Sequence, residues 1–487
     1  MSCSQPDPLD VDETEPERAF IAAGSYCSTC FEAYLYSKFK RSAEGVRYFS
    51  RTGTSMDHSP LSGRQLQPRR EVGGGGGDRH IHVRSRVLLG MSGGLGSRVL
   101  LELLKVWFPI RETSSKAPPA FAGLVVVHVE MDTEHGQPDQ EQNAFTEHLK
   151  TLVESMGIKD VEFISIPLSD IFKDSSTPDS TSETALERHQ KLVQLLHPTP
   201  SQTPSKTKID HTSLASLQRS LLFTLLRRKA RKEKCEVLVT GEGSDRVAEL
   251  TIEGMALGRG YSIGEEVGVE WEVLDRQQEQ KQEQAKGNGL LVARPVSGIL
   301  RAEMEEFVRV KRLVVPRPGV DRGEVANGRS TIQAVVTKFV TDLQKEFPST
   351  VQTVLATVHK LGMRSTDARM RIEEGETGSE SWEGCAICGG PVQEGAHRWR
   401  KAITMSDLVE TDHASATRSI EDVEPQTVIG ISESKYEESA NSLDTSLCYG
   451  CLLIPKAIAK TEDLPSYVER QRRSRRRMDD VVKEFLI

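Results

Sequence analysis

The feature that most constrains the fold is a series of short apolar runs separated by segments with helical periodicity. Five runs have the length and the aliphatic content of buried strands, over residues 83–89, 123–129, 161–166, 236–240 and 290–296. Helical patterns lie between most of them, over residues 97–107, 141–156 and 213–234. Such alternation is typical of a parallel sheet with helices on both faces. The sequence therefore predicts an α/β domain over residues 81–345.

Composition indicates that this domain carries polar insertions. Hydrophobic residues make up 37% of the 487-residue chain, which is low for a fully globular protein. Residues 171–210 are rich in Ser, Thr and Pro, and residues 272–288 are rich in Gln, Glu and Lys. Both segments are predicted to be surface insertions. Further helices are expected over residues 301–315 and 331–361.

The remaining segments are assigned from local composition and cysteine spacing. We expect a disordered tail (1–19), an N-terminal helix with a C-x-x-C pair (20–49), a linker ending in five glycines (50–80), a helix and polar linker (346–384), a cysteine module with its own insertion (385–451) and a basic C-terminal helix (452–487).

Charge and hydropathy exclude several classes of protein. The net charge is −8, so contacts with a nucleic acid must come from local basic patches. No stretch approaches the ~20 apolar residues that span a bilayer, and the acidic N-terminus does not resemble a signal or transit peptide. We therefore expect a cytoplasmic protein that contacts neither membranes nor DNA.

The first predicted strand and helix are joined by a glycine-rich turn, GMSGGLGSR. Backbone N–H groups and the dipole at a helix start attract phosphate, and glycine permits close approach. The residues suited to this role are Ser92, Gly93, Gly94, Gly96 and Ser97. Neither a Walker A lysine nor a Rossmann G-x-G-x-x-G is present. A tight turn that needs glycine for steric reasons is the alternative.

Six of the eight cysteines form three C-x-x-C pairs, a spacing that favours metal in a reducing compartment. Cys385 and Cys388 together with Cys448 and Cys451 supply four thiolates, the full set for a structural zinc ion. A redox pair or two unrelated half-sites are the alternatives.

The third pair, Cys27 and Cys30, has only Cys3 upstream of it. Three histidines could complete a zinc site there, namely His58, His80 and His82. Alternatively, this pair packs against the helix that follows it.

Three basic clusters could neutralise phosphates, although most charge runs are solvated faces. The first contains Lys38, Lys40 and Arg41. The second contains Arg227, Arg228, Lys229, Arg231, Lys232 and Lys234. The third, in the tail, contains Arg470, Arg472, Arg473, Arg475, Arg476 and Arg477.

Residues 92–97, SGGLGS, resemble the PP-loop S-G-G-x-D-S of ATP pyrophosphatases that adenylate tRNA bases, with Gly96 in place of the aspartate. Residues 240–248, TGEGSDRVA, resemble the family's T-G-H-N-x-D-D-x-A: Glu242 replaces the histidine, Ser244 replaces the first aspartate and Asp245 occupies the second. Residues 294–295, Arg-Pro, resemble the family's R-P-L segment. The resemblance implies a PP-loop ATPase-like (adenine nucleotide alpha hydrolase-like) fold.

The combination of motifs is similar to the two-subunit synthetases that make 2-thiouridine in cytosolic tRNA. The stretch CSTCFEAYLYSKFKR resembles their N-terminal C-x-x-C-F-x-x-Y-x-x-x-K-F-R, and the cysteine module resembles their C-terminal knuckles. Catalytic members carry further cysteines in the middle of the PP-loop domain. Here the matching helix has none, and Cys235 just beyond it is expected to be a buried apolar residue. The absence of these cysteines, together with Gly96, resembles the second, non-catalytic subunit.

This resemblance implies a role in modifying wobble uridine 34 of tRNA(Lys), tRNA(Glu) and tRNA(Gln). The catalytic subunit would adenylate the base with ATP and take sulfur from a thiocarboxylated ubiquitin-like carrier. This chain would complete the heterodimer and help to hold tRNA through the N-terminal and tail clusters. Whether its loop still holds ATP is left open, and zinc is the expected cofactor. The competing hypotheses are an independent ATP-dependent adenylating enzyme and a zinc-stabilised scaffold without a tRNA role.

Overall fold

The computed structural model describes most of the predicted α/β domain and the cysteine module. The described residues are 26–52, 86–108, 121–131, 140–173, 184–198, 209–260, 262–268, 270–272, 290–317, 331–347, 349–361, 384–393, 395–403 and 443–473. The predicted tail and linker over residues 1–19 and 53–80 lie outside them. In the described part of the chain, no helix combines the length and the apolar character needed to cross a membrane.

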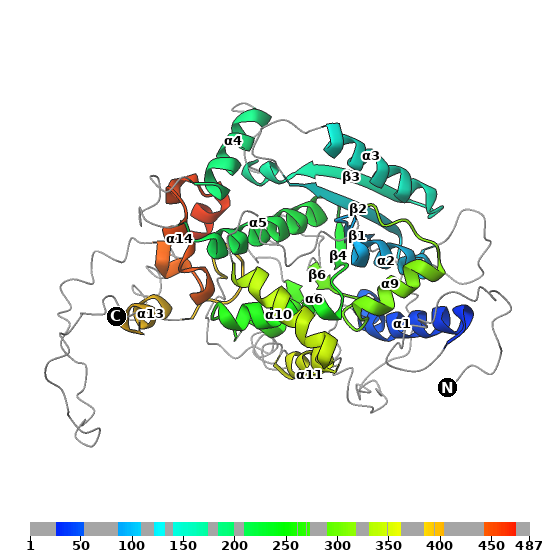
Figure 1. The fold of residues 1–487 in the computed structure, drawn as a ribbon. Helices are drawn as coiled ribbons and strands as arrows, with labels where there is room; N and C mark the ends of the chain where they lie inside the picture. Colours follow the sequence, from blue (N-terminus) through cyan, green and yellow to red (C-terminus); the bar gives the residue numbers. More distant parts are fainter. Residues whose placement is uncertain are drawn as a thin grey trace, which may run out of the picture.

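A six-stranded sheet forms the centre of the molecule (Figure 1). Its order is β3 (Val161–Pro167), β2 (Gly123–Glu130), β1 (Arg86–Gly90), β4 (Cys235–Thr240), β6 (Leu290–Ala293) and β5 (Glu270–Glu272). The first five strands are parallel, which confirms the predicted sheet. Strand β5 was not predicted, and it pairs antiparallel with β6 at the edge. Three residues are too few to show a strand pattern in the sequence.

Helices surround the sheet. They are α1 (Ser28–Thr52), α2 (Leu95–Leu104), α3 (Gln140–Ser155), α4 (Ala185–Leu196), α5 (His211–Lys232), α6 (Ser244–Ala256), α7 (Ile263–Val267), α9 (Arg301–Val310), α10 (Ile332–Glu346), α11 (Thr350–Leu361), α13 (Ala396–Ile403) and α14 (Ile454–Ala457). Short 3-10 turns include η2 (Leu168–Phe172), η6 (Leu443–Ser446) and η7 (Tyr449–Cys451). The helical pattern over residues 331–361 therefore corresponds to two helices, α10 and α11.

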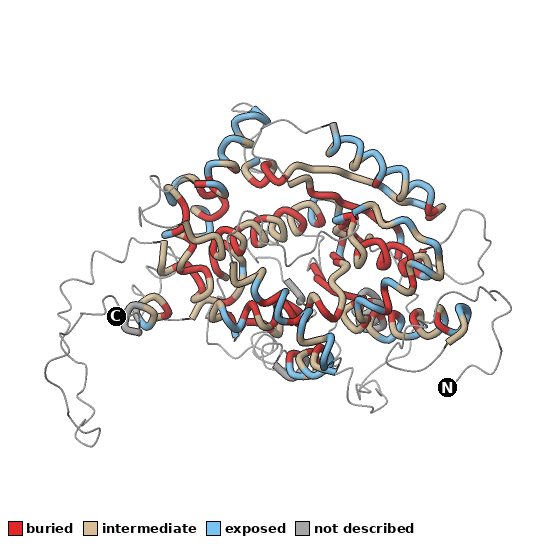
Figure 2. The backbone as a smooth tube through the Cα atoms, in the orientation of Figure 1, coloured by how far each residue is buried: buried red, intermediate tan, exposed pale blue. Residues whose placement is uncertain are grey.

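Alternate residues of the strands enter two different cores, as the two-residue period of a strand requires. Val87 and Leu89 of β1 pack with α1, α2, α3 and α9. Leu88 faces the opposite side, where it joins α4, α5 and the cysteine module. Strands β1, β2, β4 and β6 are mostly buried and β3 is mostly half-buried, whereas α3 on the outside of the sheet is largely exposed (Figure 2). The sheet is therefore covered on both faces, as predicted.

A smaller third core joins α6 to α7, α10 and α11. Val336 and Val340 of α10, together with Val351 and Leu355 of α11, are buried there. Helix α6 is part of the α/β domain, so this core fixes the helical pair to the side of the sheet.

The predicted insertion over residues 171–210 is not purely polar surface. It contains α4, which begins at a capping box in which Thr184 and Glu187 exchange side chain–backbone hydrogen bonds. Leu192 and Leu195 are buried in the sheet-face core. The flanking Ser, Thr and Pro residues concealed this helix in the composition.

Candidate metal centre and degenerate phosphate loop

The loops that follow β1 and β4 meet at one edge of the sheet. These strands are parallel neighbours, so their carboxyl ends lie together. The chain continues from β1 to β2 on one side, while β4 lies on the other. Such a reversal of strand order opens a crevice where α/β proteins commonly bind ligands. The loop after β1 is the predicted phosphate loop.

The phosphate loop has the geometry of a strand-to-helix turn. Gly93 has a φ of 80°, in the left-handed region that glycine adopts without strain, and Gly94 precedes the first turn of α2. The Ser97 hydroxyl donates to the Gly94 carbonyl at 3.0 Å and lies 3.3 Å from the Ser92 hydroxyl. The loop hydroxyls are therefore engaged within the loop.

Gly96 lies directly against the loop that follows β4. A Cβ atom at Gly96 would lie 2.0 Å from the carbonyl oxygen of Gly241, and one at Gly241 would lie 2.3 Å from the amide nitrogen of Ser97. No side chain fits either position without a backbone shift. Gly96 is the position at which the PP-loop pattern has aspartate, so this backbone arrangement has no space for the acid.

Glu242, at the histidine position of the second motif, holds two arginines together. Its carboxylate accepts from Arg219 Nη2 at 2.7 Å and from Arg294 Nε at 2.5 Å. Burial alone would raise the pKa of Glu242, but the charges of Arg219 and Arg294 outweigh burial and hold the pKa well below its usual range. The Arg219 guanidinium also lies 4.7 Å from the centre of the Phe223 ring. The sequence motif did not reveal this ion cluster, because its members come from three separate segments.

Asp245 and Ser244 bind the segment that leads into α9. The Asp245 carboxylate accepts from the backbone N–H of Arg301 at 2.7 Å, and the Ser244 hydroxyl donates to the Ile299 carbonyl at 2.8 Å. Predicted as part of the nucleotide loop, Asp245 is thus engaged at a helix start. Arg317, which the sequence did not single out, also contacts the glycine-rich loop: its backbone N–H donates to the Gly93 carbonyl at 2.9 Å.

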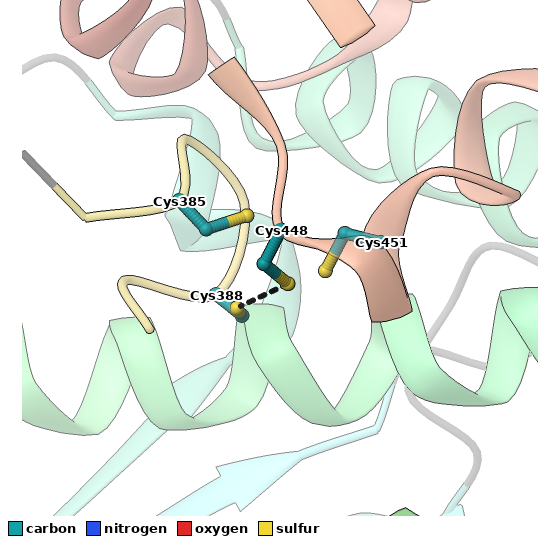
Figure 3. A group of neighbouring side chains, drawn as sticks. All are labelled: Cys385, Cys388, Cys448 and Cys451. Carbon is teal, nitrogen blue, oxygen red and sulfur yellow. Dashed lines mark hydrogen bonds between the residues drawn. The ribbon is translucent and has the colours of Figure 1, made fainter. Parts of the chain in front are cut away.

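Four cysteines from two distant segments converge at the C-terminal module. Cys385, Cys388, Cys448 and Cys451 place all four sulfur atoms within 4.8 Å of one another (Figure 3). The Sγ atoms of Cys388 and Cys448 are 3.7 Å apart. Tetrahedral metal–sulfur bonds of about 2.3 Å place sulfur pairs roughly 3.8 Å apart. The donor set therefore fits a single metal ion.

The first cysteine pair lies on a turn of the kind that zinc knuckles use. The Cys385 N–H donates to the Gly390 carbonyl at 2.6 Å, and the Gly389 N–H donates to the Cys385 carbonyl at 2.8 Å. Gly389 has a φ of 75°. These backbone hydrogen bonds fix the turn, and the turn directs Cys385 and Cys388 toward the same point.

Arg259, in the turn after α6, connects the module to the α/β domain. Its Nη2 lies 3.8 Å from Cys451 Sγ, and its side chain is buried. A Cβ at Gly450 would lie 2.5 Å from Arg259 Cγ. A buried cation beside thiolates offsets the negative charge of a four-thiolate site. By contrast, Cys235 lies apart in β4, and burial raises the pKa of its thiol to about 12.

The N-terminal pair lies at the start of α1. Cys27 is half-buried and Cys30 is exposed. Within the described ranges, the only group of three or more candidate metal ligands is the C-terminal one. The proposed additional ligands, Cys3 and the three histidines, lie outside the described residues.

The predicted RNA-binding residues differ in their surroundings. Lys38 Nζ pairs with the buried Glu303 carboxylate at 2.7 Å, whereas Lys40 and Arg41 are exposed. Arg472 and Arg473 both bind Glu469, and their hydrogen bonds, together with their charges, lower the pKa of that carboxyl to about 2. Arg475, Arg476 and Arg477 lie outside the described residues.

The cluster on α5 serves structural contacts where the structure describes it. Arg228 Nη1 donates to the Ile171 carbonyl at 2.9 Å, and Lys229 pairs with Glu233 at 2.7 Å. Arg228 and Lys229 therefore have structural partners within the protein.

The structure defines an α/β protein with a glycine-rich loop at the strand reversal and, packed on its sheet, a cluster of four cysteines that could hold a metal ion. Residues 331–453 match the family model described as cytoplasmic tRNA 2-thiolation protein 2.

Comparisons with individual relatives extend this similarity beyond residues 331–453. The chain is 23% identical to a cytoplasmic tRNA 2-thiolation protein 2 from Phaeosphaeria nodorum, over 78% of this chain and 84% of the relative. It is 24% identical to the protein of that name from Danio rerio, over 85% and 87% of the two chains. The chain thus resembles cytoplasmic tRNA 2-thiolation protein 2 over most of its length, as its motifs predicted. Among solved structures, the U34-tRNA thiolase NcsA from Methanococcus maripaludis with its [4Fe-4S] cluster matches with a TM-score of 0.41 and 14% identity, over 70% of this chain and 83% of that chain.

Proposed function

We propose that this chain is a non-catalytic subunit of a complex that 2-thiolates wobble uridine 34 of cytosolic tRNA(Lys), tRNA(Glu) and tRNA(Gln). Its partner in a heterodimer is the catalytic PP-loop subunit, which adenylates the uridine with ATP. Sulfur reaches that partner from a thiocarboxylated ubiquitin-like carrier. The chain acts in the cytoplasm, in agreement with the name of the relatives it resembles.

The contact between Gly96 and Gly241 carries the non-catalytic part of this proposal. The PP-loop pattern places an acid where this chain has a glycine backbone pressed against a carbonyl oxygen. Nucleotide chemistry needs precisely positioned charged groups around the phosphates. The loop hydroxyls, Glu242 and Asp245 are all bound to neighbouring protein groups. These engagements favour a structural role for the loop.

Zinc is the metal we propose for the four-cysteine centre. Four thiolates favour zinc or iron–sulfur chemistry. The cysteines of an iron–sulfur cubane bind four different irons and so stand wider apart than the ligands of one ion, whereas these sulfurs all lie within 4.8 Å of one another. Because every position of a Cys₄ site is a protein ligand, the ion would be structural. It would hold residues 385–388 and 448–451 together.

We propose that tRNA contacts involve the exposed Lys40 and Arg41 of the N-terminal helix and the basic tail. Arg473 is exposed at the last described turn of that tail. Lys38 and Arg472 are paired with Glu303 and Glu469. We therefore propose that they support tRNA binding indirectly, by holding their helices in place.

The deciding experiment measures 2-thiouridine in cytosolic tRNA from cells that lack this chain, by retardation in mercury-containing gels. The retarded band should disappear and should return when the wild-type chain is restored. An unchanged band would reject the proposed function and favour the metal-stabilised scaffold.

A second assay separates the subunit from an independent enzyme. The purified chain is incubated with ATP and tRNA, and pyrophosphate release is measured. No release above background is expected from the chain alone, whereas turnover would show that this chain adenylates RNA itself.

A further inference from the structure

Helix α13 presents a large exposed aromatic side chain beside the metal centre. Trp399 is 58% exposed, whereas Trp107 in the core is 2% exposed. In Figure 1, α13 lies at the end of the molecule away from α1, so it is remote from Lys40 and Arg41. Single exposed apolar residues are common on protein surfaces. The surroundings of Trp399 therefore decide whether it has a function.

Trp399 rests on Tyr449, which is itself firmly held. The two ring centres are 5.1 Å apart, with the planes tilted by 53°. The Arg400 guanidinium lies 5.1 Å from the centre of the Tyr449 ring, and its Nη1 donates to the Tyr449 carbonyl at 3.2 Å. The Tyr449 N–H donates to Gln393 at 3.2 Å. Tyr449 is therefore fixed through both its backbone and its ring.

The α/β domain closes the other approach to Tyr449. Gly258, with a φ of 73°, lies so near that a Cβ there would be 2.3 Å from Tyr449 Cε1. Tyr449 also follows the metal-ligand candidate Cys448 and precedes Cys451 by two residues. The aromatic pair thus stands on the metal centre, and a pre-ordered platform loses little conformational entropy when it binds a ligand.

The charge of α13 indicates what this platform can bind. The helix, AHRWRKAI, contains Arg398, Arg400 and Lys401 together with His397, and it has no acidic residue. The adjoining η6 contributes one acidic residue, Asp444. An aromatic surface on a helix whose sequence is cationic is the chemistry that recognises unpaired nucleotides, through base stacking and attraction of phosphates. Trp and Arg are also common in the interfaces between proteins. The helix has several basic residues and no acidic one, which favours a polyanion over a protein.

We propose that Trp399, supported by Tyr449 and Arg400, is a stacking platform for an unpaired base of RNA. This inference deepens the proposed function and rests on it for the identity of the RNA. Trp399 supplies the stacking surface, and the net positive charge of the α13 sequence attracts the phosphates of the RNA. Duplex RNA, whose bases are stacked on one another, cannot use the platform.

The test uses the full chain and two fluorescent RNAs of equal charge, an oligouridine of about ten nucleotides and a duplex. Trp399→Ala should weaken binding of the oligouridine by about fivefold to a hundredfold, because stacking is lost. Trp399→Phe should retain most of the affinity. Binding of the duplex should not change in either variant.

Phe339→Ala is the matched control, because Phe339 on α10 is 52% exposed and lies on another helix. Metal content and thermal stability show whether each variant is folded. Quenching of tryptophan emission by oligouridine, present in the wild type and absent in Trp399→Phe, reports stacking directly. Equal oligouridine affinity in wild type and Trp399→Ala would overturn the proposal. If cells without the chain lose 2-thiouridine but the two affinities are equal, the proposed function stands and only the stacking site at Trp399 is rejected.

Discussion

Three residues at motif positions after β1 and β4 have partners within the protein. Gly96 contacts the backbone of Gly241, Glu242 binds two arginines, and Asp245 accepts the N–H of Arg301. Each contact joins segments that are far apart in the sequence. The residues at these motif positions therefore hold the strand ends together. Substitutions there should lower the stability of the fold.

Gly96→Ala should destabilise the fold by about 1–3 kcal/mol, as overpacking does in a closely packed site. The added Cβ would lie 2.0 Å from the Gly241 oxygen, so one of the two loops must move. Urea unfolding followed by circular dichroism measures the loss.

The control is Gly94→Ala in the same loop. Gly94 has a φ of −80°, which any residue adopts, and a Cβ there would be 3.5 Å from the nearest atom, Ser92 Oγ. If Gly96→Ala were as stable as Gly94→Ala, the close approach of the two loops would be refuted.

Glu242 should make the folded state sensitive to acid. Its pKa is lowered in the folded state, so its contribution to stability is fully present above the pKa of the unfolded chain, about 4.3. The contribution falls as pH decreases below that value toward the lower folded pKa. Glu242→Gln should be less stable than wild type at pH 7, and the difference should narrow below about pH 4.

Thermal unfolding over a pH series measures this difference. Glu305→Gln provides the comparison, because the Arg301–Glu305 pair is 54% exposed on both sides and contributes little. If the difference in stability between wild type and Glu242→Gln were the same at every pH, the assigned ion cluster would be contradicted.

At the scale of the element, α1 is a fixed part of the domain. Phe31, Leu35 and Phe39 are buried in the core beneath the sheet. Lys38 and the Tyr34 hydroxyl both bind Glu303 of α9, at 2.8 Å and 3.0 Å to the same oxygen. Glu303 is almost fully buried, so it depends on these partners. Helix α1 is therefore held by a polar contact as well as by its apolar face.

Lys38→Met should destabilise the protein by roughly 1–3 kcal/mol, because a buried carboxylate loses a partner. Lys40→Met, on the exposed side of the same helix, should leave stability unchanged and weaken RNA binding, mainly at low salt. Limited proteolysis of α1 and RNA titrations at two salt concentrations distinguish the variants. The opposite pattern would show that Lys38 faces RNA.

Local patterns revealed most elements, whereas contacts between distant segments could not be deduced. The five parallel strands were visible as apolar runs, and the spacing of Cys385, Cys388, Cys448 and Cys451 indicated a metal centre. The pairing of Glu242 with Arg219 and Arg294 has no local pattern, because 23 and 52 residues separate the partners. Helix α4 was concealed by its polar flanks, and Trp399 had no distinguishing sequence context.

At the scale of the whole molecule, the metal module and the sheet share one core. Three of the four cysteines, Ile454 and Tyr467 belong to the same buried cluster as Leu88 and Leu238 of the sheet, and Cys388 packs against that cluster. The module is therefore not an independent appendage. Loss of a metal ion bound by the four cysteines should therefore destabilise the whole α/β domain.

Cys388→Ser should lower metal content below one ion per chain and destabilise the protein by roughly 4 kcal/mol or more. Circular dichroism measures the unfolding, and elemental analysis of the purified protein measures the metal content. Cys235→Ser, in β4 and apart from the four cysteines, should leave the metal content unchanged. Full metal occupancy in Cys388→Ser would refute the four-cysteine assignment.

The shared core also governs when the chain can finish folding. Strands β1 to β4 leave the ribosome long before the residues that cover one of their faces, which include Leu447 and Val468. Until those residues are made, Leu88 and Leu238 lack part of their native covering, and apolar surface exposed during synthesis promotes aggregation. We therefore expect the growing chain to need protection from aggregation until the second cysteine pair has been made, and a chain truncated before that pair to stay prone to aggregation.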